Sequence, residues 1–264
     1  MQPTEALMAP AATADSLSWT KAVEGLPRVL AGLAAASAGP RPWRITGFDV
    51  RRAAEGPEAL TDRPFTWSAP TAQRMIGLSA LRSLISGRAR APAQAVRDVV
   101  AELSGGGQLG TRAPTSLEQW LSGLPPAGRA ATGAAAVTWV TRLWSELDWV
   151  ALAAKGPMVI GRDHWWDSPH TSLLALRSRA EVRSGRAHLV VLNGARRRSA
   201  DTELSLVALV ETLRDGVHGA PATVVGWWPD SGHVVRIDAC PAVLDRGVAA
   251  VAAVLRARRS ALAA

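Results

Sequence analysis

The sequence predicts an α+β fold in which helices flank a mixed β-sheet and the N-terminal half is mainly helical. Up to about residue 155, apolar residues recur every three or four positions, which is the spacing of one helix face. Beyond Lys155-Gly-Pro157, short segments rich in apolar and β-branched residues are separated by Gly, Pro or Asp, as is typical of strands. Two stretches between or after these segments again have apolar residues at helical spacing, which indicates an α/β-like order of elements.

The first 155 residues are predicted to be a tail followed by a mainly helical region. Residues 1–16 are rich in Ala, Pro and Thr and are expected to form a disordered tail. The helical region, 17–155, is expected to contain one short strand at 44–50. The spacing of apolar residues predicts its helices at 19–37, 68–87, 92–103, 117–124 and 129–147.

The remaining residues, 156–264, are predicted to form an α/β core that folds as one cooperative unit with the helical region. Gly185 provides the backbone freedom for a tight hairpin between two of its strands. Because alternate residues of a strand share a face, we expect Val190 to be buried with Leu192 on the same side. The composition predicts strands at 158–160, 172–182, 187–192, 223–228 and 234–237, and helices at 204–213 and 244–258.

The composition excludes several classes of protein. Hydrophobic residues make up 48% of the 264 residues and charged residues 20%, so the chain can bury a sizeable core. No apolar run reaches the roughly 18 residues of a membrane-spanning helix, and the N-terminus lacks the pattern of a secretory signal. We therefore expect no membrane partner and a cytoplasmic location. Cys240 is the single cysteine, which excludes a disulfide framework and a cysteine-built zinc site.

The net charge of +8 at pH 7 has two interpretations. A basic domain is attracted to the phosphates of DNA or RNA without any contact to bases. However, Lys occurs only at Lys21 and Lys155, Tyr is absent, and residues with G- or C-rich codons are abundant. High-GC coding would give the same arginine-rich composition, so the charge alone does not assign a nucleic-acid partner.

Most short motifs favour a structural interpretation over a catalytic one. The sequence has no G-x-S-x-G element, and its glycine-rich segment at 105–110 lacks the G-K-[ST] ending of a phosphate loop. Asp163 and Asp167 flank a histidine and two tryptophans, but metal sites need three or four ligands and no HExxH motif accompanies them. A turn with solvated acids beside aromatic side chains is the simpler interpretation.

The segment around residue 180 carries an unusual row of charges. In an extended strand, Arg177, Arg179, Glu181 and Arg183 would alternate with small or apolar residues and share one face. A face that charged cannot pack against an apolar core, so it must be solvated, internally paired or turned toward an anion.

The order of elements here resembles the core of the PD-(D/E)XK nuclease superfamily, particularly RecB-type nuclease domains. In that family, two successive strands carry carboxylates that hold magnesium, and a lysine assists the attacking water. Residues 178–181 resemble the first strand, with Glu181 at the place of a metal ligand, and residues 188–194 resemble the second. Val190 then stands at the place of the second acid, Leu192 at that of the lysine, and Glu203 at that of a helix glutamine.

These departures from the pattern of the family predict that the nuclease reaction is lost. Magnesium is held by carboxylates in near-octahedral geometry, and Glu181 alone does not supply that set. Val190 and Leu192 provide neither a ligand nor a group that handles protons. The first hypothesis is therefore a non-catalytic nuclease-like domain without a cofactor, which binds nucleic acid or a protein. The residues expected at its anion-facing edge are Arg177, Arg179, Arg183, Arg196, Arg197 and Arg198.

Two other functions remain as alternatives. One is a magnesium-dependent nuclease whose metal site is rebuilt from Glu181 with Asp163 or Asp167. The other is a regulatory or structural protein that binds no nucleic acid, with the tryptophan pairs at 165–166 and 227–228 as anchors for a protein partner.

Overall fold

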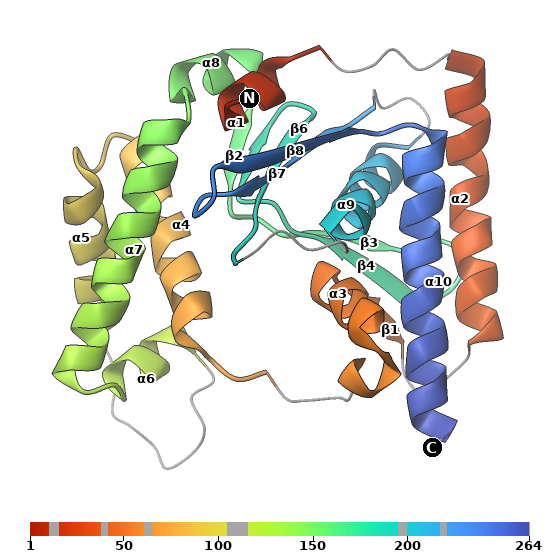
Figure 1. Cartoon of the computed structure of the whole chain (residues 1–264), viewed down its shortest axis with the longest axis horizontal. Coiled ribbons are helices and arrows are strands. Elements are labelled where there is room, and N and C mark those ends of the chain that lie inside the picture. Colours follow the sequence, from red (N-terminus) through yellow and green to blue (C-terminus); the bar gives the residue numbers. More distant parts are fainter. Residues whose placement is uncertain are drawn as a thin grey trace. The chain divides into compact units, whose positions relative to one another are not determined.

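The computed structural model describes residues 1–10, 16–37, 42–60, 65–104, 116–194, 200–216 and 221–263. They form helices together with two sheets that contain both parallel and antiparallel pairs, which confirms the α+β fold (Figure 1). The chain divides into two compact units. We call residues 1–62 and 152–264 the sheet unit and residues 63–151 the helical unit. Within the described residues, no helix has both the length and the apolar character needed to cross a membrane.

The sheet unit contains both sheets. The smaller sheet has the order β1-β4-β3, with β1 parallel and β3 antiparallel to β4. The larger has the order β2-β5-β6-β7-β8, in which only β6 and β7 are parallel. The strands are β1 (Trp43–Ile45), β2 (Met158–Ile160), β3 (His164–Asp167), β4 (Leu174–Ser178), β5 (Val182–Ser184), β6 (Ala187–Val191), β7 (Thr223–Trp228) and β8 (His233–Asp238).

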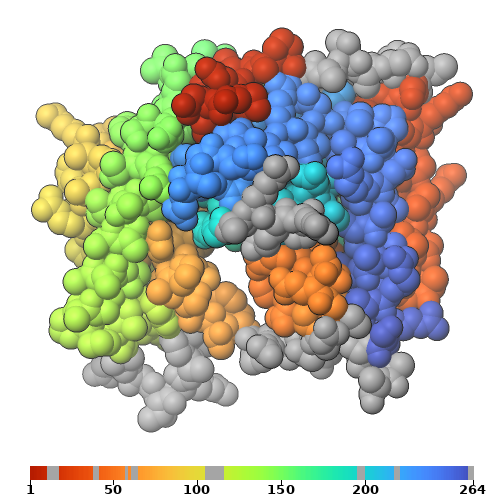
Figure 2. Space-filling view, in the orientation of Figure 1, coloured from red at the N-terminus to blue at the C-terminus, as the bar shows by residue number. Residues whose placement is uncertain are grey.

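The main helix of the core is α9 (Ala200–Asp215), which connects the parallel strands β6 and β7 and contacts both sheets. The C-terminal helix α10 (Pro241–Ala263) packs on α9, and α2 (Ser16–Ala36) and α3 (Gly47–Glu55) pack on these two (Figure 1). Figure 2 shows α3 and α10 in contact at the surface. The other helices of the unit are α1 (Pro3–Met8) and the 3-10 helix η1 (Pro57–Leu60), and α8 (Trp149–Lys155) contains the boundary at 151.

The helical unit consists of α4 (Ala69–Ile85), α5 (Pro92–Ser104), α6 (Leu117–Ser122) and α7 (Pro126–Glu146). All four helices were expected from the apolar spacing, which their buried residues follow, as at Ile76, Leu81 and Leu84 of α4. The unit is shorter than the helical region 17–155 expected from the sequence, because α2 and α3 bury their apolar faces in the sheet unit.

Part of the segment expected as a disordered tail, 1–16, is helical, and residues 11–15 lie outside the described residues. Residues 3–8 form α1, in which Leu7 is 1% exposed and Gln2 and Glu5 form a capping box. The ammonium group of Lys155 donates a hydrogen bond to the carbonyl oxygen of Leu7. Two buried apolar residues in this short segment, Ala6 and Leu7, provide the contacts that hold it to the sheet unit.

The short strand expected at 44–50 is β1, and it ends at Ile45. The chain turns into α3 because Thr46 caps that helix. The side-chain oxygen of Thr46 accepts a hydrogen bond from the backbone N–H of Asp49, and the Asp49 carboxylate accepts one from the backbone N–H of Thr46 at 2.8 Å. The pattern Thr-x-x-Asp is the sequence signal of this turn.

The strand expected at 172–182 is divided between the two sheets. β4 ends at Ser178 and pairs with β1 and β3, whereas β5 begins at Val182 and pairs with β2 and β6. Three residues between them take the chain from one sheet to the other. The hairpin of β5 and β6 agrees with the prediction, with Gly185 at φ +54° in the turn. The row of charged residues therefore does not share one face.

Close packing of α9 on α10 depends on Gly247. A Cβ atom added at Gly247 would lie 2.8 Å from the carbonyl oxygen of Ser205 and 2.9 Å from Cβ of Leu209. We expect Gly247→Ala to lower the free energy of unfolding by about 1–3 kcal/mol, because neither atom can move without moving α9.

The matched control is Gly32→Ala in α2, where an added Cβ would meet no atom within 4 Å. Alanine at an open helix position should raise the stability by about 0.5–1 kcal/mol. Urea unfolding of the three proteins measures both changes. Equal stabilities of the two variants would contradict the packing described here.

Candidate functional site

The carboxylate of Glu181 lies at the junction of the two sheets and is fully buried. Its Oε2 accepts a hydrogen bond of 2.7 Å from the backbone N–H of Val191, and its Oε1 accepts bonds of 3.2 and 3.1 Å from Nε and Nη2 of Arg179. Both oxygens therefore have partners from this chain. The side chain fixes the end of β6 and the position of Arg179.

Val190 and Leu192, at the end of β6, are buried as expected, 8% and 7% exposed. The backbone N–H of Glu181 donates to the carbonyl oxygen of Leu189, so Glu181, directly before β5, lies beside β6 and Val190. The surroundings of Val190 thus contain aliphatic side chains and one carboxylate, that of Glu181, which is held by hydrogen bonds.

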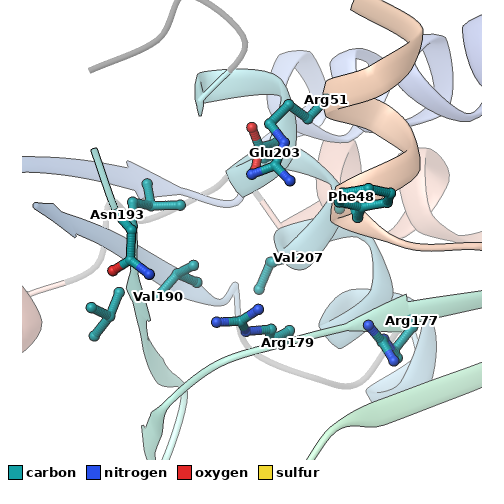
Figure 3. Close-up of a pocket in the computed structure, with 11 residues that line it drawn as sticks. Phe48, Arg51, Arg177, Arg179, Val190, Asn193, Glu203 and Val207 are labelled. Carbon is teal, nitrogen blue, oxygen red and sulfur yellow. The ribbon is translucent and has the colours of Figure 1, made fainter. Parts of the chain in front are cut away.

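A pocket of about 250 Å³ opens over these residues (Figure 3). Its floor is aliphatic, formed by residues 190–192 and Val207. Its polar groups come from Arg51 of α3, from Arg177 and Arg179 at the end of β4, and from Asn193 and Glu203 around the connection from β6 to α9. Gly47 and Phe48 of α3 complete the described lining.

The connectivity explains the position of this pocket. β6 and β7 are parallel, and the chain leaves the carboxyl end of β6 to enter α9. In sheets with parallel strands, ligands commonly bind beyond the carboxyl ends of these strands. Here the first turn of α9 presents Asp201 and Glu203, and Glu203 is 9% exposed.

The described lining carries three guanidinium groups and one carboxylate. Two of the guanidinium groups are also paired with carboxylates outside the lining, Arg177 with Asp163 and Arg179 with Glu181. Two of the three arginines have contacts that orient their guanidinium groups. Arg51 lies over the ring of Phe48, 5.0 Å from its centroid, and Arg177 lies over Trp165 at 5.6 Å and 3.6 Å from the carboxylate of Asp163. Arg177 and Arg179 were expected at an anion-facing edge, and both line the pocket. Arg51 was not foreseen, because the strand expected at 44–50 covered the first residues of its helix.

Arg183 does not face the pocket, contrary to the expectation from sequence. Its side chain is 3% exposed, and its Nη2 lies 3.2 Å from Oε1 of Glu211 and 3.2 Å from Oγ of Ser178. The change of sheet between β4 and β5 explains the difference, because it breaks the alternation that would have aligned Arg183 with Arg177. Arg196, Arg197 and Arg198 lie outside the described residues.

Glu211 of α9 is the common partner in a buried cluster of polar side chains. Its Oε2 lies 2.8 Å from Nδ1 of His164, and its Oε1 accepts hydrogen bonds from Ser178 and Arg183. Burial acts to raise the pKa of Glu211, but His188, Arg183 and the hydrogen bonds from Ser178 and His164 lower it to about 2. Sequence reasoning missed this cluster, although a carboxylate inside the apolar run 204–213 was its signal.

His188 of β6 lies in the same region and is also buried. It is 3% exposed, and neither ring nitrogen has a hydrogen-bond partner among the described residues. Burial lowers the pKa of His188 to about 3. The imidazole is therefore neutral in the folded protein at neutral pH.

The three acids considered for a rebuilt metal site lie in surroundings that differ from one another. Asp163 pairs with Arg177, Asp167 is exposed on β3, and both oxygens of Glu181 accept the hydrogen bonds described above. Among the residues that the structure describes, no group of three or more His, Cys, Asp or Glu side chains is placed to hold a metal ion.

The two tryptophan pairs differ in exposure. Trp227 and Trp228 are 2% and 0% exposed and belong to the core around β7, so they are not surface anchors. Trp166 is 8% exposed, whereas Trp165 on the opposite face of β3 is 40% exposed. Only Trp165 of these four is available to a partner.

No family model, curated protein or solved structure matches the chain. The assignment of a function therefore rests on the chemistry of the pocket.

Proposed function

We propose that this chain is a non-catalytic, nuclease-like domain that binds the phosphate backbone of nucleic acid in the arginine-lined pocket, in the cytoplasm. The observation that carries the proposal is the pocket itself. Three guanidinium groups and the carboxylate of Glu203 surround an aliphatic floor, and the carboxylate of Glu181 behind it is held by hydrogen bonds. Guanidinium groups suit phosphate because they present several donors in a plane and remain charged at neutral pH.

The order of elements supports the nuclease-like part of the proposal. β5, a tight turn, β6, α9 and then β7 follow one another as in the family that the sequence resembles. Glu181 adjoins β5, and Val190 lies on the neighbouring strand β6. A nuclease of that kind needs further carboxylates and a proton-handling group at this place, and valine and leucine supply neither.

We expect purified protein to cleave neither DNA nor RNA in the presence of magnesium or manganese. The measurement is the fraction of a labelled oligonucleotide cut over hours, compared with an added nuclease as positive control. Cleavage that disappears in Glu181→Gln and persists in the exposed control Asp245→Asn would contradict the proposal and favour the rebuilt metal site.

We expect the wild-type protein to bind nucleic acid weakly, without sequence preference and with strong salt dependence. Each phosphate neutralised on duplex DNA contributes a slope of about 0.9 to log affinity against log salt. Three arginines in contact with phosphate therefore give a slope of up to about 2.7. Fluorescence anisotropy with two unrelated labelled oligonucleotides at several salt concentrations measures it. Absence of binding at low salt would reject the proposal and leave a protein partner as the better hypothesis.

A further inference from the structure

Two exposed aromatic side chains contact arginines of the arginine-lined pocket. Phe48 lines the pocket and is 51% exposed, and Trp165 on the edge strand β3 is 40% exposed. Large aromatic side chains are expensive to leave in water, and the other tryptophans of β3 and β7 are buried. Their exposure beside a charged pocket therefore points to a ligand with a flat apolar surface.

Each exposed ring is accompanied by two arginines. Arg51 and Arg52 lie 5.0 and 5.3 Å from the centroid of Phe48. Arg44 and Arg177 lie 5.9 and 5.6 Å from that of Trp165. Cations at this distance interact with the face of the ring, so a base that stacks on that face replaces the guanidinium group, which then becomes available to a phosphate. Both rings thus stand next to guanidinium groups that can contact phosphate.

The pocket and the rings are continuous. Arg177 belongs to both, because it lines the pocket and lies over Trp165. Phe48 enters the pocket from α3, and Figure 3 shows Phe48 and Arg177 at the same side of the pocket. The surface from Trp165 through Arg177 to Phe48 therefore alternates aromatic and cationic groups.

From this arrangement we infer that the ligand is a single-stranded nucleic acid, whose bases stack on Phe48 and Trp165 while its phosphates contact the neighbouring arginines. The inference rests on the proposed function and adds the strand type. Proteins that bind single strands combine a cationic track with aromatic side chains on which bases stack. In a duplex the bases are paired and stacked inside, so two isolated rings find no base faces to contact.

The experiment measures the affinity of the full chain for a labelled oligothymidylate and for a duplex of equal length. The variants are Phe48→Leu and Trp165→Leu, which remove a ring without changing charge. Phe48→Tyr and Trp165→Phe keep a ring at each position. The matched control is Phe65→Leu, since Phe65 is 68% exposed and lies in the helical unit. Thermal unfolding of each variant checks the fold.

The expected result has three parts. Wild type prefers the single strand. Each leucine variant binds it roughly 5- to 100-fold more weakly, as loss of one stacked base predicts, with an unchanged salt slope. The tyrosine, phenylalanine and Phe65→Leu variants bind like wild type.

Three outcomes would overturn the inference, and they separate its failure from that of the proposed function. Equal affinity for both strand types, or equal weakening of both by the leucine variants, would reject base stacking and leave the phosphate-binding function intact. Absence of binding to either strand type would reject the proposed function and the inference with it.

Discussion

Replacement of Glu211 by alanine is expected to lower the free energy of unfolding by about 3–5 kcal/mol. The guanidinium group of Arg183 is 3% exposed and has Glu211 as its carboxylate partner at 3.2 Å. Without that carboxylate, the positive charge of Arg183 would remain buried without this partner. Ser178 and His164 would also lose the acceptor that they share. Urea unfolding at pH 7 measures the loss.

Two further variants separate the charge from the packing. Glu24→Ala removes an exposed helical carboxylate and should change the stability by less than about 0.5 kcal/mol. The double variant Arg183→Met with Glu211→Leu removes both charges. Its free energy of unfolding should fall less than that of Glu211→Ala, because no unpaired charge stays buried. A double variant that is less stable than Glu211→Ala would show that hydrogen bonding and shape, rather than charge compensation, dominate this cluster.

Acidification from pH 7 to pH 5 is expected to cost about 2 kcal/mol through His188 alone. Burial lowers the pKa of His188 from its ordinary 6.5 to about 3. Between these two values the unfolded chain binds a proton that the folded protein does not. Stability therefore falls as the pH falls, by about 1.4 kcal/mol for each pH unit once the pH is below 6.5.

The variant His188→Leu tests this expectation, because leucine fills a similar volume and does not titrate. Its free energy of unfolding, measured in urea at pH 7, 6 and 5, should fall less steeply with acid than that of wild type. Burial also lowers the pKa of His164, which gives a dependence of the same sign in both proteins. If the free energy of unfolding fell equally steeply with acid in wild type and variant, the assignment of this pH dependence to His188 would be contradicted. Glu211, with its pKa near 2, adds its own loss only below about pH 4.5, its ordinary value.

The apolar spacing was sufficient to predict most elements of the fold. The helices α4, α5 and α7 and the hairpin of β5 and β6 follow from periodic apolar residues and from Gly185, which are local signals. The division of the expected strand 172–182 was not predictable in the same way. It depends on which sheet accepts each half, and that choice is made by distant partners, β1 and β3 for one half and β2 and β6 for the other.

The candidate site was predictable only in part for the same reason. Arg177 and Arg179 were identified because they stand in a charged row, but the row was assumed to be one strand face. Arg183 passes to the inside of the molecule because Glu211, 28 residues further along, compensates its charge. Arg51 joins the pocket because Thr46 starts a helix where a strand was expected. Long-range pairing of charges leaves no local pattern in the sequence.

The most direct test of the central claim compares the salt dependence of nucleic-acid binding in two double variants. Arg51→Gln with Arg177→Gln removes two cations of the pocket, and Arg246→Gln with Arg256→Gln removes two exposed cations of α10. If the pocket holds phosphate, the slope of log affinity against log salt falls in the pocket variant by up to about 1.4 for a single strand, or about 1.8 for duplex DNA, and keeps its wild-type value in the α10 variant. Equal slopes in wild type and both variants would show that the pocket does not contact the phosphate backbone.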